Sequence, residues 1–171
     1  NHFNCPVVAY YSELLRGNME ELKEVNFLYP YISIETPAEL TTTIFDAVKA
    51  LDSEIRKSEV KKASKAAFEA YKKFKDELRA EGDRALAYAR SKGKRIMILA
   101  GRPYHIDPEI GHGIDKLAAS LGFVVISEDS VSDLAPVQYV QVLDQWTFHS
   151  RLYRAARYAT EHDDTELVQL V

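Results

Sequence analysis

Apolar and polar positions follow a helical period through the middle of the chain. Over residues 37–91 apolar side chains recur every three to four positions, with lysine and glutamate on the opposite face. Thr36-Pro37-Ala38-Glu39 has the pattern of a capping box with a first-turn proline, so the helical region begins there. We predict two or three helices, with a break at Gly82 and an end at Gly93. The clearest apolar face consists of Ala67, Phe68, Tyr71, Phe74 and Leu78.

The segment before this region has the pattern of short strands. Residues 5–10 are apolar and partly β-branched, which predicts a buried strand. Residues 12–16 can form a short helix that ends at Gly17 and Asn18. Residues 29–34 predict a second strand, and the proline inside it places that strand at an edge or a bend.

After Gly93 short apolar runs alternate with a helical pattern. Residues 95–100 and 123–126 are apolar runs of strand length, and residues 113–121 have helical spacing up to Gly122. Strand, helix and strand within about 30 residues form a βαβ unit, whose strands are parallel. The apolar face of the helix consists of Ile114, Leu117, Ala118 and Leu121.

The C-terminal part predicts one more helix, over residues 137–160, and a strand-like end over residues 166–171. The patterns together predict an α/β fold with a Rossmann-like parallel sheet. Residues 93–171 supply the βαβ unit and a C-terminal helix, and residues 36–92 form a long helical insertion. The apolar positions of the C-terminal helix include Val142, Leu143, Trp146, Leu152 and Tyr153.

Composition narrows the class of protein. A chain of 171 residues has the length of one domain, and both ends are typical of a single α/β domain excised from a larger protein. The net charge of −4 argues against nucleic-acid binding. No apolar run reaches the roughly 20 residues that cross a membrane. The single cysteine excludes an internal disulfide and fits a reducing compartment, so we expect a cytoplasmic protein.

Candidate chemistry gathers where the two strands of the βαβ unit end. Ligands of parallel α/β sheets bind beyond the carboxyl ends of the strands, so residues 101–109 and 127–130 are expected to meet at one rim. His112 opens the following helix, whose free N–H groups favour an anion. No residue is identified as catalytic. The ligand-binding candidates are Arg102, Tyr104, His105, His112, Glu128 and Ser130.

Each candidate also has a structural interpretation. Arg102 can hold a phosphate or carboxylate, or it can pair with a carboxylate such as Asp107, Glu109 or Asp129. The two histidines can act as acid–base groups or metal ligands, or they can cap a helix. On the last helix, Trp146 and His149 are spaced to share one face, which is typical of a core position.

Cys5 has two interpretations as well. A cysteine before proline in an apolar strand is commonly an inert buried residue. It can instead be a thiolate ligand of an iron–sulfur cluster, but one cysteine cannot hold a cluster alone, so the other ligands would lie outside this chain.

Several motifs resemble one known family. The chain is similar to an internal domain of the long CoA-substrate-specific activase-related proteins, which resemble the activator and the dehydratase component of (R)-2-hydroxyglutaryl-CoA dehydratase joined in one chain. Two local departures are Gly111, where the family pattern has asparagine, and Ser12, near which it has proline. The matching segments are Phe3-Asn4-Cys5-Pro6-Val7-Val8, Gly101-Arg102-Pro103-Tyr104-His105-Ile106-Asp107-Pro108-Glu109-Ile110, His112-Gly113-Ile114, Ser127-Glu128-Asp129-Ser130 and Trp146 with His149-Ser150-Arg151-Leu152-Tyr153.

The resemblance implies function in a larger protein. Its members are linked to oxygen-sensitive [4Fe-4S] clusters, and ATP-driven electron transfer reduces a dehydratase that removes water from a 2-hydroxyacyl-CoA. The resemblance implies Rossmann-like domains with helical additions, and it implies a cluster-ligand role for Cys5 in the full-length protein. No actin-like ATPase motif is present in this sequence, so the chain is not the activator domain itself. We expect no cofactor and no enzymatic activity in this fragment alone, whereas the parent is a 2-hydroxyacyl-CoA dehydratase-like lyase or its activator.

Three hypotheses follow. The first is a domain that supports an iron–sulfur cluster and contacts acyl-CoA in the full-length chain. The second is a small-ligand module that binds a phosphate or nucleotide at the rim. The third is a docking domain without chemistry, which contacts neighbouring domains of the parent chain or forms a homodimer.

Overall fold

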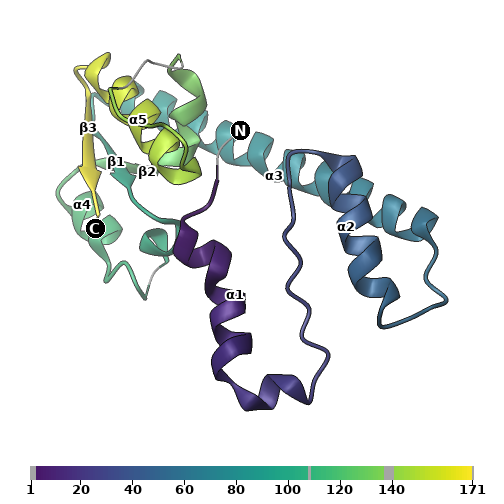
Figure 1. Ribbon diagram of the computed structural model, residues 1–171. Coiled ribbons are helices and arrows are strands. Elements are labelled where there is room, and N and C mark those ends of the chain that lie inside the picture. The colour runs from purple at the N-terminus through teal and green to yellow at the C-terminus, as the bar shows by residue number, and fades with distance from the viewer. Residues whose placement is uncertain (1–2, 108, 137–140, 171) are drawn as a thin grey trace. The chain divides into compact units, whose positions relative to one another are not determined.

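The computed structural model describes residues 3–107, 109–136 and 141–170, and its chain divides into two compact units (Figure 1). The first unit is Phe3–Phe74, and the second begins at Lys75. Helix α3, Lys57–Ser91, contributes to both units. No described helix is long and apolar enough to cross a membrane.

The first unit begins with a helix where we predicted a strand. Helix α1 is Pro6–Asn18, with Pro6 in its first turn and Cys5 as its N-cap residue. The prediction of a buried strand over residues 5–10 is therefore wrong. Proline suits the first turn of a helix, and the valines of this run are exposed, with Val7 65% accessible. An apolar run of this length fits either element, and none of the described strands pairs with it to select the extended form.

The segment after α1 contains a short 3-10 helix, Glu20–Lys23, and no strand. The predicted strand over residues 29–34 is wrong, because these described residues pair with no other strand. Tyr31 instead packs edge-on against Tyr10 of α1, with ring centroids 6.1 Å apart. Aromatic packing thus holds this segment beside the helix.

The predicted helical region is confirmed. Helix α2 is Pro37–Lys49, and α3 follows after a short turn. Thr36 is the N-cap residue as expected, although its side chain makes no capping hydrogen bond. The predicted break at Gly82 is wrong, since α3 continues through this residue. The predicted end is confirmed, because α3 ends shortly before Gly93, which has a positive φ of 60°.

The second unit contains a three-stranded sheet. Strand β1 is Ile96–Ala100, β2 is Val124–Ser127 and β3 is Thr165–Gln169. The order is β2-β1-β3, and β1 is parallel to both neighbours. Helix α4, Ile114–Ser120, connects β1 to β2 and completes the predicted βαβ unit. The α/β class and the parallel strands are confirmed, while the three described strands are fewer than a complete Rossmann fold requires.

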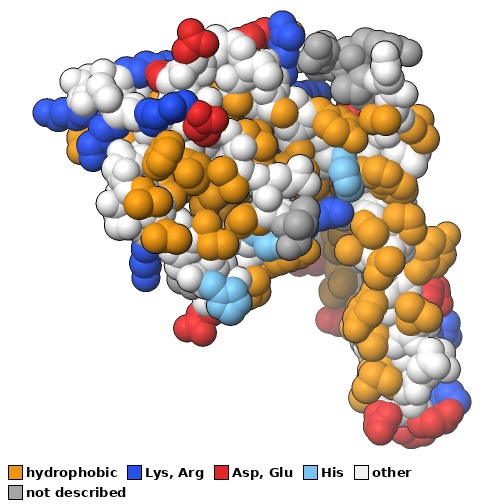
Figure 2. Space-filling model, turned by 90° about the vertical axis from the view of Figure 1, so that its left-hand side faces the viewer, with side chains coloured by type: hydrophobic (Ala, Val, Ile, Leu, Met, Phe, Trp, Pro, Cys, Tyr) orange, Lys and Arg blue, Asp and Glu red, His pale blue; other side chains and the backbone are white. Residues whose placement is uncertain are grey.

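Different helices cover the two faces of this sheet. Ile96 and Ile98 are fully buried in a core formed with helix α5, Thr147–Thr160, and the end of α3. Leu99 alternates to the other face, where it lines a pocket together with Asp115 of α4. Hydrophobic side chains are visible on the surface of this second side in Figure 2, and α4 itself leaves Leu117 and Leu121 exposed.

The C-terminal helix is shorter than predicted. We expected a helix from residue 137, but residues 137–140 lie outside the described residues, and α5 begins at Thr147. Val142 and Leu143 precede the helix and are exposed, so they form no helical core face. Trp146 is the N-cap residue and is half-buried, and the shared face with His149 stays a prediction. The strand predicted at the C-terminal end is confirmed as β3.

Candidate functional site

The rim predicted from the sequence is present in the second unit. Strands β1 and β2 are adjacent and parallel, so the loops that follow Ala100 and Ser127 leave the same edge of the sheet. Strand β3 ends at this edge too, where the backbone N–H of Leu170 donates to the carbonyl of Ala100 at 2.7 Å. Three strand ends therefore contribute to the rim.

The loop after β1 folds around His105, which belongs to the 3-10 helix Pro103–Ile106. The backbone N–H of Arg102 donates to Nδ1 of His105 at 3.0 Å, and the His105 N–H donates to the Arg102 carbonyl at 2.9 Å. Because Nδ1 accepts a hydrogen bond, the proton of the neutral ring lies on Nε2. A Cβ at Gly101 would lie 2.3 Å from this Nδ1, so the arrangement requires glycine there.

Gly111 closes the far end of the same loop. Its N–H donates to the Asp107 carbonyl at 2.8 Å, and a Cβ on it would lie 2.6 Å from the His105 carbonyl oxygen. The side chain of Asp107 holds the turn by accepting the N–H groups of Glu109 and Ile110 at 2.8 and 3.1 Å. A side chain at position 111 would collide with the loop backbone, so this loop conformation requires glycine there.

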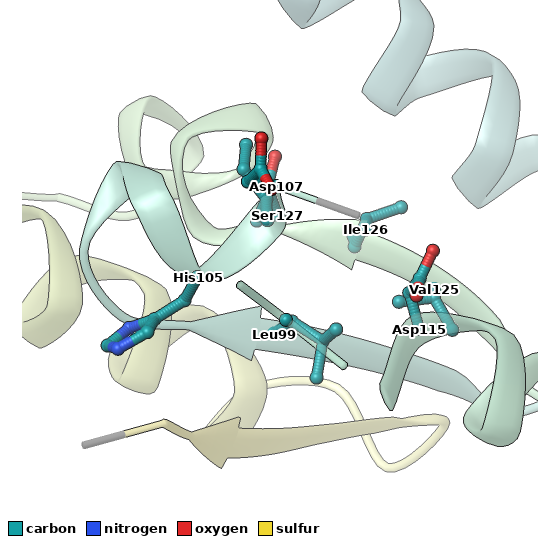
Figure 3. Close-up of a pocket in the computed structure, with 9 residues that line it drawn as sticks. Leu99, His105, Asp107, Asp115, Val125, Ile126 and Ser127 are labelled. Carbon is teal, nitrogen blue, oxygen red and sulfur yellow. The ribbon is translucent and has the colours of Figure 1, made fainter. Parts of the chain in front are cut away.

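A pocket of about 220 Å³ lies between this loop, α4 and the strands β1 and β2 (Figure 3). Leu99 and Val125 supply apolar side chains, while two aspartates and a serine supply polar groups. His105 contributes to the lining, but its ring is directed away from the other labelled residues, consistent with the bond from Arg102. The lining residues are Leu99, His105, Ile106, Asp107, Gly111, Asp115, Val125, Ile126 and Ser127.

Arg102 is directed to α5 and not to the pocket lining. Its guanidinium carbon lies 5.5 Å from the centroid of the Phe148 ring, and that of Arg151 lies 4.8 Å from the same ring. Within the described residues Arg102 makes no ion pair with Asp107, Glu109 or Asp129, so the predicted structural pairing is wrong. Two guanidinium groups therefore share one aromatic ring at the rim.

Among the described residues, Arg151 has a carboxylate partner and Arg102 has none. The Nη2 atom of Arg151 donates to Oε1 of Glu128 at 2.5 Å, and Glu128 is only 4% exposed. Burial raises the pKa of Glu128, the positive charge of Arg151 opposes this rise, and the negative charge of Asp129 adds to it. Glu128 thus acts as the buried counter-ion that fastens α5 to the loop after β2.

Ser130 has a packing role in the same loop. Its hydroxyl donates to the Ser127 carbonyl at 2.7 Å, and its own carbonyl accepts from Nη1 of Arg79 at 3.3 Å. The residue is buried, and its Cβ lies 2.8 Å from the position that a Cβ of Gly82 would occupy. Gly82 therefore permits a close approach of α3 to this loop. We predicted a helix break at this glycine, whereas its role is to leave room for Ser130.

The remaining candidates are not gathered into the pocket. Tyr104 is exposed and stacks edge-on against the His105 ring at 4.5 Å. His112 is exposed with a φ of 49°, a conformation that usually marks a turn. Cys5 lies in the first unit, half-buried at the start of α1. No group of three or more potential metal ligands occurs among the described residues.

Sequence reasoning missed Phe148 and Arg151 as members of the rim. The two residues are three positions apart, so they occupy neighbouring turns on one side of a helix. That spacing is visible in the sequence. Their approach to Arg102, however, depends on how α5 packs against the sheet.

Comparisons with known proteins test the resemblance directly. A sequence model of one family, described as CoA enzyme activase uncharacterised domain, matches residues 1–131. Searches of curated proteins and of solved structures gave no match. The match confirms the activase-related resemblance inferred from the motifs. The chain belongs to the CoA enzyme activase uncharacterised-domain family.

Proposed function

We propose that this activase-related domain binds the phosphate-bearing part of a CoA ester at the carboxyl edge of its sheet, with Arg102 as the anion contact. The observation that carries the proposal is the position of the Arg102 guanidinium, which is supported by Phe148 and has no carboxylate partner among the described residues. Binding, and no reaction, is what we propose for this chain alone.

Electrostatics supports an anionic ligand here. Of the two arginines on the Phe148 ring, Arg151 is neutralised by Glu128, whereas the charge of Arg102 is not balanced by a neighbour in the described structure. A guanidinium that stacks on an aromatic ring keeps its N–H edge available for a phosphate. Such charge-assisted hydrogen bonds are about twice as strong as neutral ones.

The order of the strands also favours a ligand site at this edge of the sheet. The order β2-β1-β3, with α4 and α5 on opposite faces, makes the junction of β1 and β3 a topological switch point. Doubly wound sheets bind ligands outside the strand ends at such a point. The proposal therefore includes a Rossmann-like sheet, of which these three strands are a part. Arg102 follows β1 directly and lies beside this junction.

Replacing Arg102 by alanine is expected to weaken the binding of acetyl-CoA about tenfold to a hundredfold, because a hydrogen bond to a charged group contributes roughly 1.5–3 kcal/mol. Isothermal titration calorimetry of the 171-residue chain measures the change. Arg84→Ala is the matched control, since Arg84 is exposed on α3 and pairs with Glu81. Equal affinity of the Arg102 variant and the wild type would contradict the proposal.

The iron–sulfur part of the family resemblance concerns Cys5. We propose it as one cluster ligand in the full-length protein, on the strength of the resemblance and of its partly accessible position before α1. The chain contains one cysteine, whereas a [4Fe-4S] cluster commonly takes four, so these residues do not fit a complete site. A cytoplasmic location, contacts with neighbouring domains and a homodimer stay predictions.

The cluster proposal has its own test in a longer chain that contains the flanking sequence. Cys5→Ser is expected to lower the iron and sulfide bound after anaerobic reconstitution, because a thiolate ligand is lost. Ser12→Ala on the same helix controls for changes in α1. Iron and sulfide content equal to wild type would remove Cys5 from the ligand set.

A further inference from the structure

We infer that the pocket between the loop after β1 and strand β2 holds the pantetheine arm of the ligand whose phosphates contact Arg102. The inference rests on the proposed function and extends it from one contact to two subsites. It assigns a ligand group to a pocket of about 220 Å³ whose lining is part apolar and part polar and includes no lysine or arginine.

The chemistry of the pocket is unusual for a phosphate site. Its polar side chains are Asp107, Asp115 and Ser127. The carboxylates only accept hydrogen bonds when ionised, and the hydroxyl of Ser127 donates its proton to Oδ1 of Asp129 at 2.6 Å. All three groups therefore offer lone pairs to a ligand. A matching ligand has hydrogen-bond donors and no negative charge.

Pantetheine has the complementary groups. It is uncharged, it carries two amide N–H groups and a hydroxyl, and its geminal methyl groups suit an apolar surface such as Leu99 and Val125. A phosphate in the same place would face two carboxylates, and like charges in contact are strongly unfavourable. The pocket thus separates the two halves of a CoA ester by charge.

The backbone of one loop links the two subsites. Arg102 lies at the start of this loop, and its backbone N–H donates a hydrogen bond to the His105 ring. His105 in turn is one of the residues that line the pocket. Glycines at positions 101 and 111 let the loop fold closely around His105. The same loop therefore supplies residues to both subsites, as one elongated ligand requires.

Two ligand halves distinguish the subsites. Pantetheine and adenosine 3′,5′-bisphosphate are titrated separately into the 171-residue chain, with the methyl signals of Leu99 and Val125 followed by NMR. Pantetheine is expected to shift these signals.

Two variants test the pocket itself. Ile106→Trp fills the pocket from its exposed side, and Asp115→Asn removes a carboxylate from its lining. Each is expected to weaken the binding of pantetheine at least about fivefold and to leave the binding of the bisphosphate unchanged. Arg102→Ala is expected to do the reverse.

Asp133→Asn is the matched control, because Asp133 is an exposed first-turn aspartate of the 3-10 helix Ser132–Leu134, outside the pocket. The inference is overturned if pantetheine leaves the methyl signals of Leu99 and Val125 unmoved while the bisphosphate binds, and the proposed function then stands. Stronger binding of spermidine or ribose than of pantetheine would also overturn it. If pantetheine binds and the bisphosphate does not, the Arg102 proposal fails instead, and with it the two-subsite inference.

Discussion

Replacing Arg151 by methionine is expected to lower the free energy of unfolding by about 3 kcal/mol at pH 7.5, because it leaves the buried carboxylate of Glu128 without its counter-ion. The change also removes one of the two guanidinium groups from the Phe148 ring. Urea denaturation of both proteins measures the difference. Arg157→Met on the same helix is the control, since Arg157 makes an exposed pair with Glu161 and should contribute less than about 1 kcal/mol.

This loss is expected to depend on pH with a definite sign. Burial already holds the pKa of Glu128 above the ordinary 4.5, and loss of Arg151 removes the influence that opposes this rise. The folded state then keeps a proton that the unfolded state releases, so stability falls as pH rises from 4.5 through the raised pKa. The difference between variant and wild type should therefore shrink from pH 7.5 to pH 5. An equal difference at both pH values would show that Glu128 is not the cause.

Replacing Gly82 by valine is expected to destabilise the second unit by about 3 kcal/mol, because even a Cβ at this position would lie 2.8 Å from the Cβ and 3.0 Å from the carbonyl oxygen of Ser130. Backbone atoms cannot rotate away, so the 3-10 helix Glu128–Ser130 must shift as a whole. The shift would also move Glu128 away from Arg151. Thermal and urea unfolding both measure the loss.

The control for this change is Ala80→Val on the same helix. Ala80 is exposed, so this substitution costs only the lower helix propensity of valine, roughly 0.7 kcal/mol or less. The larger loss at Gly82 would then measure the close approach of α3 to the loop after β2. Similar stability of the two variants would mean that the loop has room to yield.

The pattern of apolar and polar residues was sufficient to predict those elements in which apolar positions recur with a regular spacing. The long helical region was predicted because its apolar positions keep helical spacing over several turns. Strands β1 and β2 and their parallel pairing followed from two buried runs joined by a helix. The prediction for residues 5–10 was wrong because a short apolar run is compatible with both helix and strand. The proline in the first turn favours the helix that the structure shows.

The candidate site could be located from the sequence, but not its internal arrangement. The loop with Arg102 and His105 was placed at the strand ends because parallel strands fix that edge. The pocket, however, is lined mainly by residues that were not candidates, such as Asp115 and Val125. The predicted carboxylate partners of Arg102 were wrong because proximity in sequence does not determine where a long side chain is directed.

The sequence by itself determined the family, the helical region and the parallel βαβ unit with its polar rim, since these depend on motifs and on periodic local preferences. Only the tertiary structure decided that β3 lies beside β1, that Phe148 and Arg151 approach Arg102, and that Gly82 permits a contact with Ser130. These contacts join residues that are at least 46 positions apart. They are set by how whole elements pack, and no local spacing in the sequence encodes that packing.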